Sequence, residues 1–489
     1  MNVALSVRAV RDMRLGYTRA VAAISFAGLI GRLLFLDHQT LWRDEAFTAL
    51  AVAKPLGHML DVVRADSAPP LGYLLQHFIA PLSPGATGLR LTSALAGTAA
   101  IPLSAALGRR AGGDRAGIAS ALLVMASPAF VLTARDARMY ALAITLVLAS
   151  TLLLVRAVER PSTMRWLSYA AVTTLALYTN YFAAFAVAAQ LFAIGVVMRA
   201  VWRTALTAAV CAAVSAALLV PWLVAAHAQF THTSGFFWVA PVGFSSTSGE
   251  LVQFFTGPTF DTWVPSLGVL YALQGIAAAA GIGATAVLVW RWRALSSAQC
   301  RNAWFLLGCG AGALLLLLVL SIWRPLVNAR YMAVMWAPLY PLVGTGFALI
   351  TRRTLVAAGV IATASASVAL CAAEIHSDTP AAIAWLQSHI GSDGLVDAYP
   401  TQYLLLLYYG SPSVTSRTHV VSPGGDVDWF WGTAVYPPGA VLGAVAAGTG
   451  TVYYVAQPND PQTPVGLPPG YHAQSTECWT GVCVTSYTP

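Results

Sequence analysis

Charge is what this sequence has least of. Only 9% of its 489 residues are Asp, Glu, Lys or Arg, against about 25% in an ordinary soluble chain. Hydrophobic residues make up 57%, and the mean hydropathy is +0.67. This composition excludes a disordered chain and a nucleic-acid-binding protein. It predicts a protein that crosses a membrane several times.

Lysine is almost absent as well. Of the 27 basic residues, 26 are Arg, and the single Lys54 is followed by Pro55. The chain therefore contains no GxxxxGKS or GxxxxGKT phosphate loop, and it contains no GxGxxG fingerprint either. These absences exclude a P-loop ATPase and a nucleotide-binding Rossmann enzyme.

Long apolar runs, by contrast, are abundant. Eleven of them can form a helix of about 20 residues, the length that crosses a ~30 Å hydrocarbon core. They lie near residues 17–37, 88–108, 115–134, 139–156, 166–181, 182–198, 204–225, 267–290, 302–323, 330–350 and 354–373. We therefore expect residues 1–373 to form an all-α polytopic membrane domain with about eleven crossings and additional interfacial helices.

The few charges sort by side of the membrane. Loops on one side hold 17 of the 27 basic residues but only Asp12, Asp114 and Glu159 of the 19 acids. The positive-inside bias assigns that side to the cytoplasm. We expect a multi-pass plasma-membrane protein whose N-terminus is cytoplasmic, whose first helix is an uncleaved anchor and whose C-terminal part is extracytoplasmic. The net charge of +8 then reflects topology and does not indicate an anionic partner in solution.

Residues 374–489 differ in composition from the rest of the chain. They contain turns rich in Pro, Gly and Tyr, a strand-like run over 451–456 and a helix-like stretch over 380–390. We expect them to form a small α/β extracytoplasmic domain. The segment Asp426-Val427-Asp428 matches the DxD motif of enzymes that bind a metal and a nucleotide sugar. Because only two residues are fixed, we interpret it as a solvated turn.

The chain has six cysteines. Cys478 and Cys483, in Cys-Trp-Thr-Gly-Val-Cys, are the only two outside the expected helices and their cytoplasmic ends. On an oxidising side of the membrane we expect them to form a hairpin disulfide. The alternative is a pair of free thiols.

Three expected external segments carry charge that membrane folding does not require. The first contains Asp44 and Glu45 and, further along, Asp66. A carboxylate in a partly dry site can take a proton from a hydroxyl, so this segment can supply a general base. The alternative is that Asp44 caps a helix that begins near Glu45.

The second and third segments combine arginine with other polar residues. Ionisable groups at a membrane edge are costly unless they are paired or functional. Arg138 can hold a phosphate with its planar fork, with Asp136 as its partner or as a metal ligand; a structural Arg–Asp pair is the alternative. Arg330 opens an expected helix, where the macrodipole disfavours a cation, so we expect an anion nearby. Snorkelling of Arg330 toward lipid phosphates is the alternative.

Six short motifs in these regions follow one another along the chain: Trp42-Arg43-Asp44-Glu45-Ala46, Asp66-x-x-Pro69-Pro70-Leu71-x-Tyr73, Arg90-Leu91-x-Ser93-Ala94, Asp136-Ala137-Arg138-Met139-Tyr140, Tyr178-Thr179-Asn180-Tyr181-Phe182 and Arg330-Tyr331. In this order they resemble GT-C glycosyltransferases of the protein-mannosyltransferase and aminoarabinose-transferase type, over roughly residues 17–373. Members of that family move a sugar from a polyprenyl-phosphate carrier to an acceptor at the outer face of the membrane, with inversion.

The resemblance implies a GT-C fold and assigns roles to single residues. Asp44 is the expected catalytic base, Glu45 would shape the site, and Asp136 would assist or, with Asp44, bind a divalent cation; no other cofactor is expected. The expected ligands of the donor phosphate and sugar are Arg138, Tyr140, Arg330, Tyr331, Asp66 and Asn180. Lys54 is a further candidate for the phosphate, but it belongs to none of the motifs. Asn180 stands where relatives often have His, which bears on recognition of the acceptor or the donor head more than on the reaction. Asp136 stands where Glu is commoner, a shortening that keeps the charge.

The predicted function is therefore transfer of a sugar from a polyprenyl-phosphate donor to a lipid- or glycan-linked acceptor, or to a protein, of the cell envelope. Mannose is the first expectation, and arabinose or another pentose is the second. The expected partners also include plasma-membrane lipids, but no nucleic acid. A transporter or flippase of lipid-linked sugar is an alternative of another class, disfavoured because the sequence shows no internal repeat. A non-catalytic scaffold is a further alternative.

Overall fold

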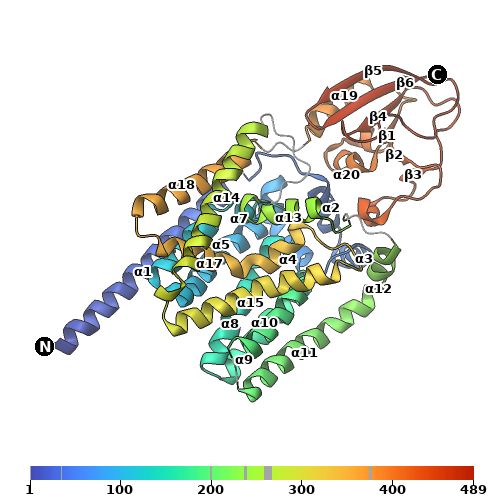
Figure 1. Ribbon diagram of the computed structural model, residues 1–489. Helices are drawn as coiled ribbons and strands as arrows, with labels where there is room; N and C mark the ends of the chain where they lie inside the picture. The colour runs from blue at the N-terminus through green and yellow to red at the C-terminus, as the bar shows by residue number, and fades with distance from the viewer. Residues whose placement is uncertain are drawn as a thin grey trace.

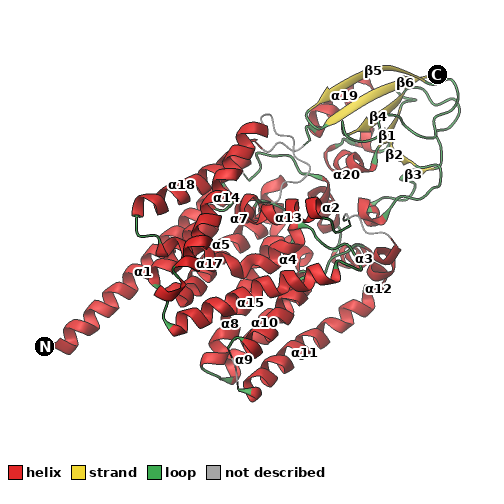
Figure 2. Ribbon diagram, viewed as in Figure 1, coloured by secondary structure: helices red, strands yellow, loops and turns green. Residues whose placement is uncertain are grey.

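The computed structural model describes residues 2–34, 36–198, 201–235, 239, 241–257, 267–373 and 377–489. A large bundle of helices occupies most of the molecule, and a mixed α/β domain lies at one end of it (Figures 1 and 2). The predicted all-α membrane domain with a small α/β domain after it is therefore confirmed.

All eleven segments predicted to cross the membrane are helical. They are α1 (Asn2–Leu33), α5 (Gly85–Gly112), α6 (Asp114–Ala126) with α7 (Pro128–Ala134), α8 (Tyr140–Glu159), α9 (Thr163–Thr179), α10 (Ala183–Val196), α11 (Trp202–Ala225), α14 (Leu267–Trp290), α15 (Ser297–Leu320), α16 (Ala329–Trp336) with η3 (Ala337–Leu339) and α17 (Tyr340–Leu349), and α18 (Arg353–Ala373). Two of them, α9 and α10, contain 17 and 14 residues.

Length and composition qualify six helices of the described chain as membrane spans, or seven if α6 and α7 form one span. These two helices meet at a bend of 54°. Ser127 is extended there because the ring of Pro128 disfavours a helical conformation for the residue before it. The number of eleven crossings stays a prediction.

The centre of the bundle is built on small residues. A Cβ atom at Gly108 or at Gly344 would collide with Ser120 of α6, and one at Gly346 would collide with the backbone of Ala284. Glycine lets α5, α6, α14 and α17 approach closely, which is how helices pack where lipid removes the hydrophobic drive to associate. In the span 329–349, 83% of the most apolar window is buried, against 22% in α18, which is therefore peripheral.

Short helices connect these long ones. The chain between α1 and α5 forms α2 (Arg43–Val52), α3 (Leu56–Ala65), α4 (Leu71–Ile79) and η1 (Ala80–Leu82), and the chain between α11 and α14 forms α12 (His227–Gly235) and α13 (Phe244–Thr256). The apolar stretch over 71–82 forms α4 and η1, which together are too short to cross a membrane. The remaining 3₁₀ turn of the bundle is η2 (Trp292–Ala294).

The C-terminal domain contains a six-stranded sheet in the order β3-β2-β1-β4-β6-β5. Its strands are β1 (Leu395–Ala398), β2 (Thr418–Val421), β3 (Val441–Leu442), β4 (Val452–Ala456), β5 (His472–Trp479) and β6 (Val482–Thr488). The first four are parallel, and the β5–β6 hairpin adds to β4 in the antiparallel direction. Its helical turns are α19 (Thr379–His389), α20 (Pro400–Tyr409), α21 (Pro412–Thr415), η4 (Trp429–Trp431) and η5 (Thr433–Val435).

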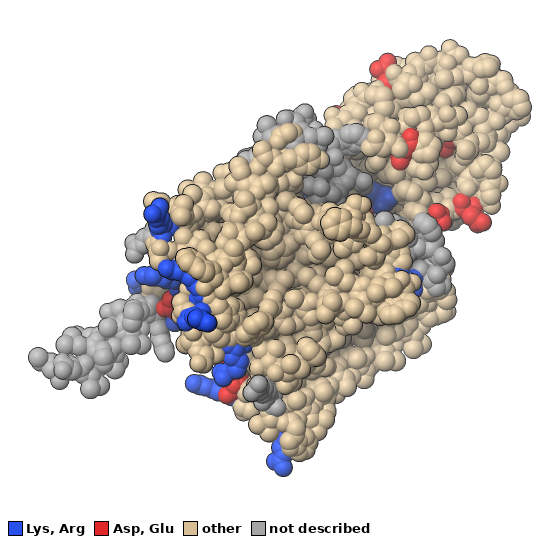
Figure 3. Space-filling view, in the orientation of Figure 1, with Lys and Arg blue, Asp and Glu red and all other residues tan. Residues whose placement is uncertain are grey.

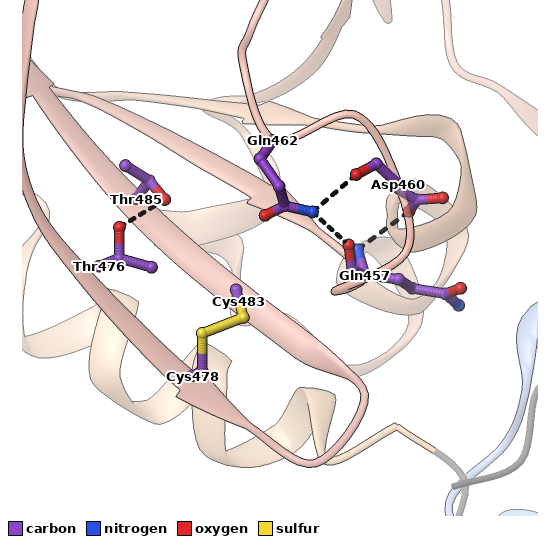
Figure 4. Close-up of a disulfide and its surroundings, with 7 residues drawn as sticks. All are labelled: Gln457, Asp460, Gln462, Thr476, Cys478, Cys483 and Thr485. Carbon is purple, nitrogen blue, oxygen red and sulfur yellow. Dashed lines mark hydrogen bonds between the residues drawn. A yellow bond between two sulfur atoms is a disulfide. The ribbon is translucent and has the colours of Figure 1, made fainter.

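Cys478 and Cys483 face each other across the β5–β6 hairpin and form a disulfide, as predicted (Figure 4). Cys211, Cys300 and Cys309 are free thiols.

The two parts of the chain share one hydrophobic cluster. Phe47 and Val52 of α2 pack in the same cluster as Leu404 and Leu405 of α20. Because α2 belongs to the region between α1 and α5, the C-terminal domain is seated directly on that region. The domain boundary predicted between residues 373 and 374 stays a prediction, since residues 374–376 lie outside the described chain.

Candidate active site

A cavity of about 680 Å³ lies where the bundle meets the C-terminal domain. Its walls come from α2, the segment after α3, the α7–α8 loop, the α9–α10 junction, the start of α16 and the η4 turn. Seven of the predicted site residues line it: Asp44, Asp66, Arg138, Tyr140, Asn180, Arg330 and Tyr331. Glu45, Asp136 and Lys54 do not.

Asp44 borders the cavity from the first turn of α2. Its Oδ1 accepts hydrogen bonds from Arg43 Nε and Nη2 at 3.3 and 3.2 Å, and its Oδ2 accepts one from Arg330 Nη1 at 3.0 Å. Burial raises the pKa of this carboxyl, but the charges of Arg43, Arg138 and Arg330 outweigh burial and hold the pKa below its ordinary value. Asp44 is thus an ionised carboxylate that remains 21% exposed toward the cavity.

The alternative interpretation of Asp44 as a helix cap is wrong. Helix α2 begins at Arg43, and the residue before it, Trp42, stands at the N-cap position. The carboxylate that reaches back to the Trp42 backbone N–H is that of Glu45, at 3.4 Å. The side chain of Asp44 is therefore left to interact with arginines.

Glu45 lies behind the cavity wall, fully buried. It forms a bidentate ion pair with Arg90 of α5, with 2.7 Å between Oε1 and Nε and 2.5 Å between Oε2 and Nη2. Its Oε1 also accepts a hydrogen bond from the backbone N–H of Ala137 at 2.8 Å. With both oxygens engaged, Glu45 holds α2, α5 and the α7–α8 loop together. Its place in the structure is that of a positioning residue.

Asp136 contacts the cavity only through a neighbour. Its Oδ1 accepts a hydrogen bond from Trp42 Nε1 at 3.1 Å, and the Trp42 ring lies under the guanidinium of Arg330, with 4.3 Å from Cζ to the ring centroid. Burial, together with the charge of Glu45, raises the pKa of Asp136 to about 7. Asp136 therefore orients the indole on which Arg330 rests.

Arg138 lines the cavity from the α7–α8 loop and is 8% exposed. Its Nη1 donates hydrogen bonds to Thr48 Oγ1 at 3.2 Å and to Tyr73 Oη at 3.1 Å. Within the described residues no carboxylate pairs with it and its Nε has no hydrogen-bond partner. A buried guanidinium without an ion pair is a strong receptor for an anion.

Tyr73 connects Arg138 to Asp66. The Tyr73 hydroxyl accepts from Arg138 and donates to Asp66 Oδ2 at 3.0 Å. Burial raises the pKa of Asp66 above its ordinary value and that of Tyr73 well above its own. Asp66 is thus a half-buried acceptor that lines the cavity from the segment after α3, suited to accept a hydrogen bond from a hydroxyl group.

The α9–α10 junction shapes a third wall. Asn180 ends α9, and its Oδ1 accepts a hydrogen bond from the Phe182 backbone N–H at 2.8 Å. The Phe182 ring stacks on Tyr331, with 4.1 Å between centroids and 10° between planes. Tyr140, at the start of α8, is buried beside them. These residues form the apolar part of the cavity.

Lys54 follows α2 at the end away from Asp44, and the structure does not bring it to the cavity. Conversely, sequence reasoning assigned no role to Arg43 or to Trp431. The Arg43 guanidinium pairs with Asp44 and lies over the Trp431 ring, with 4.8 Å from Cζ to the centroid. In the sequence, the one feature that could have drawn attention to Trp431 is the aromatic run Trp429-Phe430-Trp431, which lies outside the six motifs.

The fit of a divalent cation is poor in this arrangement. Asp44 is paired with two guanidinium groups, and Asp136 faces Trp42 from outside the cavity. Among the described residues no three His, Cys, Asp or Glu side chains are grouped so as to hold a metal ion. A metal held jointly by Asp44 and Asp136 is not favoured by their positions and stays an untested prediction.

Comparison with known proteins places this site in context. Residues 67–224, less than half of the chain, match the family model of dolichyl-phosphate-mannose-protein mannosyltransferases. No curated protein matches the chain in sequence.

Solved structures share the whole architecture. ArnT from Cupriavidus metallidurans bound to undecaprenyl phosphate superposes with a TM-score of 0.58 at 13% identity, covering 95% of this chain and 97% of that one. Its apo state gives a TM-score of 0.56 at 12% identity, with 98% of each chain covered. The archaeal oligosaccharyltransferase AglB from Archaeoglobus fulgidus, in complex with an inhibitory peptide and a dolichol-phosphate, gives 0.52 at 13% identity, covering 86% of this chain and 64% of that one. At such identities the likeness shows a common fold, which is the predicted GT-C fold.

Proposed function

We propose that this chain, a membrane glycosyltransferase of the GT-C superfamily, transfers a sugar from a polyprenyl-phosphate carrier to a hydroxyl group of a cell-envelope acceptor. One observation carries the proposal: a single cavity contains the ionised Asp44 and the buried Arg138, which pairs with no carboxylate of the described residues. A base and an anion receptor are the two groups that this reaction needs.

The geometry supports the following sequence of events. The Asp44 carboxylate takes the proton of the acceptor hydroxyl as the hydroxyl oxygen attacks the anomeric carbon of the sugar. The bond between that carbon and the carrier phosphate oxygen breaks, and its electron pair stays on the phosphate. Attack and departure on opposite faces of the ring invert the configuration. Arg43 donates twice to Asp44 Oδ1, whereas Oδ2 accepts one hydrogen bond, from Arg330, and keeps a second lone pair with which it can act as the base.

The carrier phosphate is assigned to Arg138 and Arg330. Negative charge develops on the leaving phosphate, and preorganised guanidinium groups in a partly dry cavity stabilise it without reorganisation. Two comparisons support a lipid phosphate as the ligand: ArnT was solved with undecaprenyl phosphate and AglB with a dolichol-phosphate.

Mannose is the proposed sugar, supported by the description of the family whose model residues 67–224 match. A pentose such as arabinose is the second candidate within the same reaction.

The cavity is proposed to open on the extracytoplasmic side of the plasma membrane. Basic residues gather at the end of the bundle that lies away from the C-terminal domain, and acidic residues mark the surface of that domain (Figure 3). The positive-inside bias then assigns the C-terminal domain to the outside. A flippase is less well supported, because the charged groups of the site cluster around Asp44 at one end of the bundle.

The proposal is tested with the purified full-length chain, polyprenyl-phosphate-mannose and a glycolipid extract as acceptor. We expect transfer of mannose, and a loss of about 10²–10⁴ in rate in Asp44→Asn, the range of general-base catalysis. Asp61→Asn is the matched control, since Asp61 is exposed and pairs with Arg64 outside the cavity. Transfer at the wild-type rate by Asp44→Asn would remove Asp44 as the base. No transfer from either the mannosyl or the arabinosyl carrier would contradict the proposed reaction.

A further inference from the structure

The C-terminal domain contains a second cavity, of about 230 Å³. It lies at the carboxyl ends of β1 and β2, where Tyr399 and Pro400 follow one strand and Ser422 and Pro423 follow the other. The strand order reverses beside this edge, since the chain leaves β3 at the rim of the sheet and returns as β4 on the other side of β1. In open sheets of parallel strands, this is the edge at which ligands bind.

A buried carboxylate lines the cavity. Asp397 of β1 is 2% exposed. Its Oδ1 accepts a hydrogen bond from the backbone N–H of Val421 at 3.1 Å, whereas its Oδ2 has no hydrogen-bond partner in the described part of the chain. A buried acceptor without a donor is unfavourable. A ligand hydroxyl that donates to Oδ2 would remove this cost.

The other lining residues define the chemistry of the ligand. Asp426 and Asp428 stand exposed at the cavity and add two carboxylates, and Tyr399, Tyr454 and Trp431 contribute aromatic rings. No Lys, Arg or His lines the cavity, which excludes a phosphate or another anion. The described residues also offer no group of three ligands for a metal ion.

This set of groups matches one ring of a saccharide. Carboxylates accept hydrogen bonds from vicinal hydroxyls, and aromatic rings pack against the C–H faces of a sugar. The volume is below the roughly 300–1,000 Å³ of cavities for drug-sized ligands, so it suits a single ring.

The turn that carries Pro461, one of the lining residues, is preorganised. Asp460 Oδ2 accepts a hydrogen bond from the Gln457 backbone N–H at 2.9 Å, and Gln462 Nε2 donates to the carbonyls of Gln457 and Asp460 at 2.8 and 2.7 Å (Figure 4). The Tyr454 hydroxyl donates to the carbonyl of Pro461 at 2.8 Å. A rigid wall reduces the entropy that a ligand must lose on binding.

The second cavity adjoins the candidate active site through one side chain. Trp431 lines both cavities. On the active-site side it lies under the guanidinium of Arg43, which is paired with Asp44. A glycan bound against Trp431 is therefore separated from the proposed base by two side chains, Trp431 and Arg43.

We propose that the second cavity binds one saccharide unit of the acceptor glycan and so presents a hydroxyl of the same glycan to Asp44. That this glycan is the acceptor rests on the proposed transferase function; the binding of a saccharide in the cavity does not. Asp397 and Asp428 hold the hydroxyls of the ring, and the aromatic side chains hold its apolar face.

Saturation-transfer NMR on the detergent-solubilised full-length chain tests the site at pH 8.5, where Asp397 is ionised and Oδ2 is an acceptor. The probes are methyl α-mannopyranoside and methyl α-arabinofuranoside, and no lipid donor is present. We expect at least one probe to bind with a Kd of about 1 mM. Asp397→Asn keeps the acceptor for the Val421 N–H but replaces Oδ2 by a donor, and we expect it to weaken binding about tenfold or more. Asp428→Asn, at an exposed position, is expected to weaken binding a few-fold. Glu477→Gln, in exposed β5 of the same domain, is the control and should bind as the wild type does.

The outcomes separate the site from the transferase reaction. Absence of binding by both probes would overturn the proposal, and so would wild-type affinity in both Asp variants or an equal loss in Glu477→Gln. If Asp397→Asn does not fold, as judged by thermal unfolding, Asp428→Asn decides the question. Sugar binding without any mannose transfer would contradict only the proposed function. Transfer without sugar binding would contradict only this site.

Discussion

Arg330 donates from Nη1 to Asp44 Oδ2 at 3.0 Å, although the two residues are 286 positions apart in the chain. The pair joins the start of α16 to the start of α2 at the wall of the cavity. Arg330 stands at a helix N-terminus, where the macrodipole disfavours a cation, and Asp44 supplies the anion that this position required. Snorkelling of Arg330 into lipid headgroups does not describe this side chain, which is 8% exposed and packed on Trp42.

Replacement of Arg330 is expected to weaken use of the lipid donor. Arg330→Gln should lower kcat/KM about 10²-fold, the cost of losing one group that stabilises the charge of a transition state. Arg330→Lys should recover only part of this, because lysine keeps the charge but not the planar fork. Steady-state kinetics with a varied lipid donor measure both. Arg64→Gln, on the exposed face of α3, is the control; a kcat/KM in Arg330→Gln equal to that of the control would refute the assignment.

Asp136 is expected to act through Trp42 and not by proton transfer. Asp136→Asn retains the acceptor for the Trp42 N–H and should keep the activity within about threefold. Asp136→Leu removes the acceptor, lets Trp42 and Arg330 shift, and should cost about 10²-fold, as small misplacements in a site do. If Asp136→Asn lost as much activity as Asp44→Asn, Asp136 would be a catalytic residue after all.

The Glu45–Arg90 pair is expected to be essential for stability. Arg90→Leu leaves a buried carboxylate without its partner and should lower the free energy of unfolding by about 3–5 kcal/mol. The thermal unfolding midpoint of the detergent-solubilised protein reports this loss. Arg110→Leu, which breaks the more exposed pair with Glu159, should shift the midpoint far less. Equal shifts in the two variants would contradict a special role of the buried pair.

The buried Asp397 makes the stability of the protein depend on pH. Burial raises the pKa of Asp397 to about 7, from 3.8 in an unfolded chain. Below both values the carboxyl is neutral in both states and folding bears no charge cost. As the pH rises above about 4 the unfolded chain ionises first, so the folded state loses stability until the pH passes about 7, by at most roughly 4 kcal/mol.

Asp397→Asn cannot ionise and should not show this loss. Its unfolding midpoint relative to the wild type is therefore expected to rise between pH 4 and pH 7 and to level off above. Asp393→Asn, at an exposed position of the same domain, provides the baseline. Parallel curves for wild type and Asp397→Asn across this range would show that the carboxyl is not held neutral.

The architecture was predictable because local sequence patterns carry it. A long apolar run must become a helix in a membrane, since its backbone groups have no water to bond. The disulfide was predictable because Cys478 and Cys483 stand at the two ends of a short hairpin, which brings them together. The position of Glu45 was not predictable. In the sequence, Asp44 and Glu45 are two adjacent acidic residues that nothing distinguishes. In the structure, the rotation of α2 from one residue to the next turns Asp44 to the cavity and Glu45 to Arg90.

Sequence alone determined which residues carry the scarce charges, on which expected membrane face they gather, and that several of them belong to motifs of one family. Only the tertiary structure decided their roles. The pairing of Asp44 with Arg330, the absence of an ion-pair partner for Arg138 within the described chain, and the placement of Trp431 beside Arg43 depend on contacts between segments hundreds of residues apart. The strength of a charge as a base or an anion receptor depends on its burial and its neighbours, and those are properties of the folded chain.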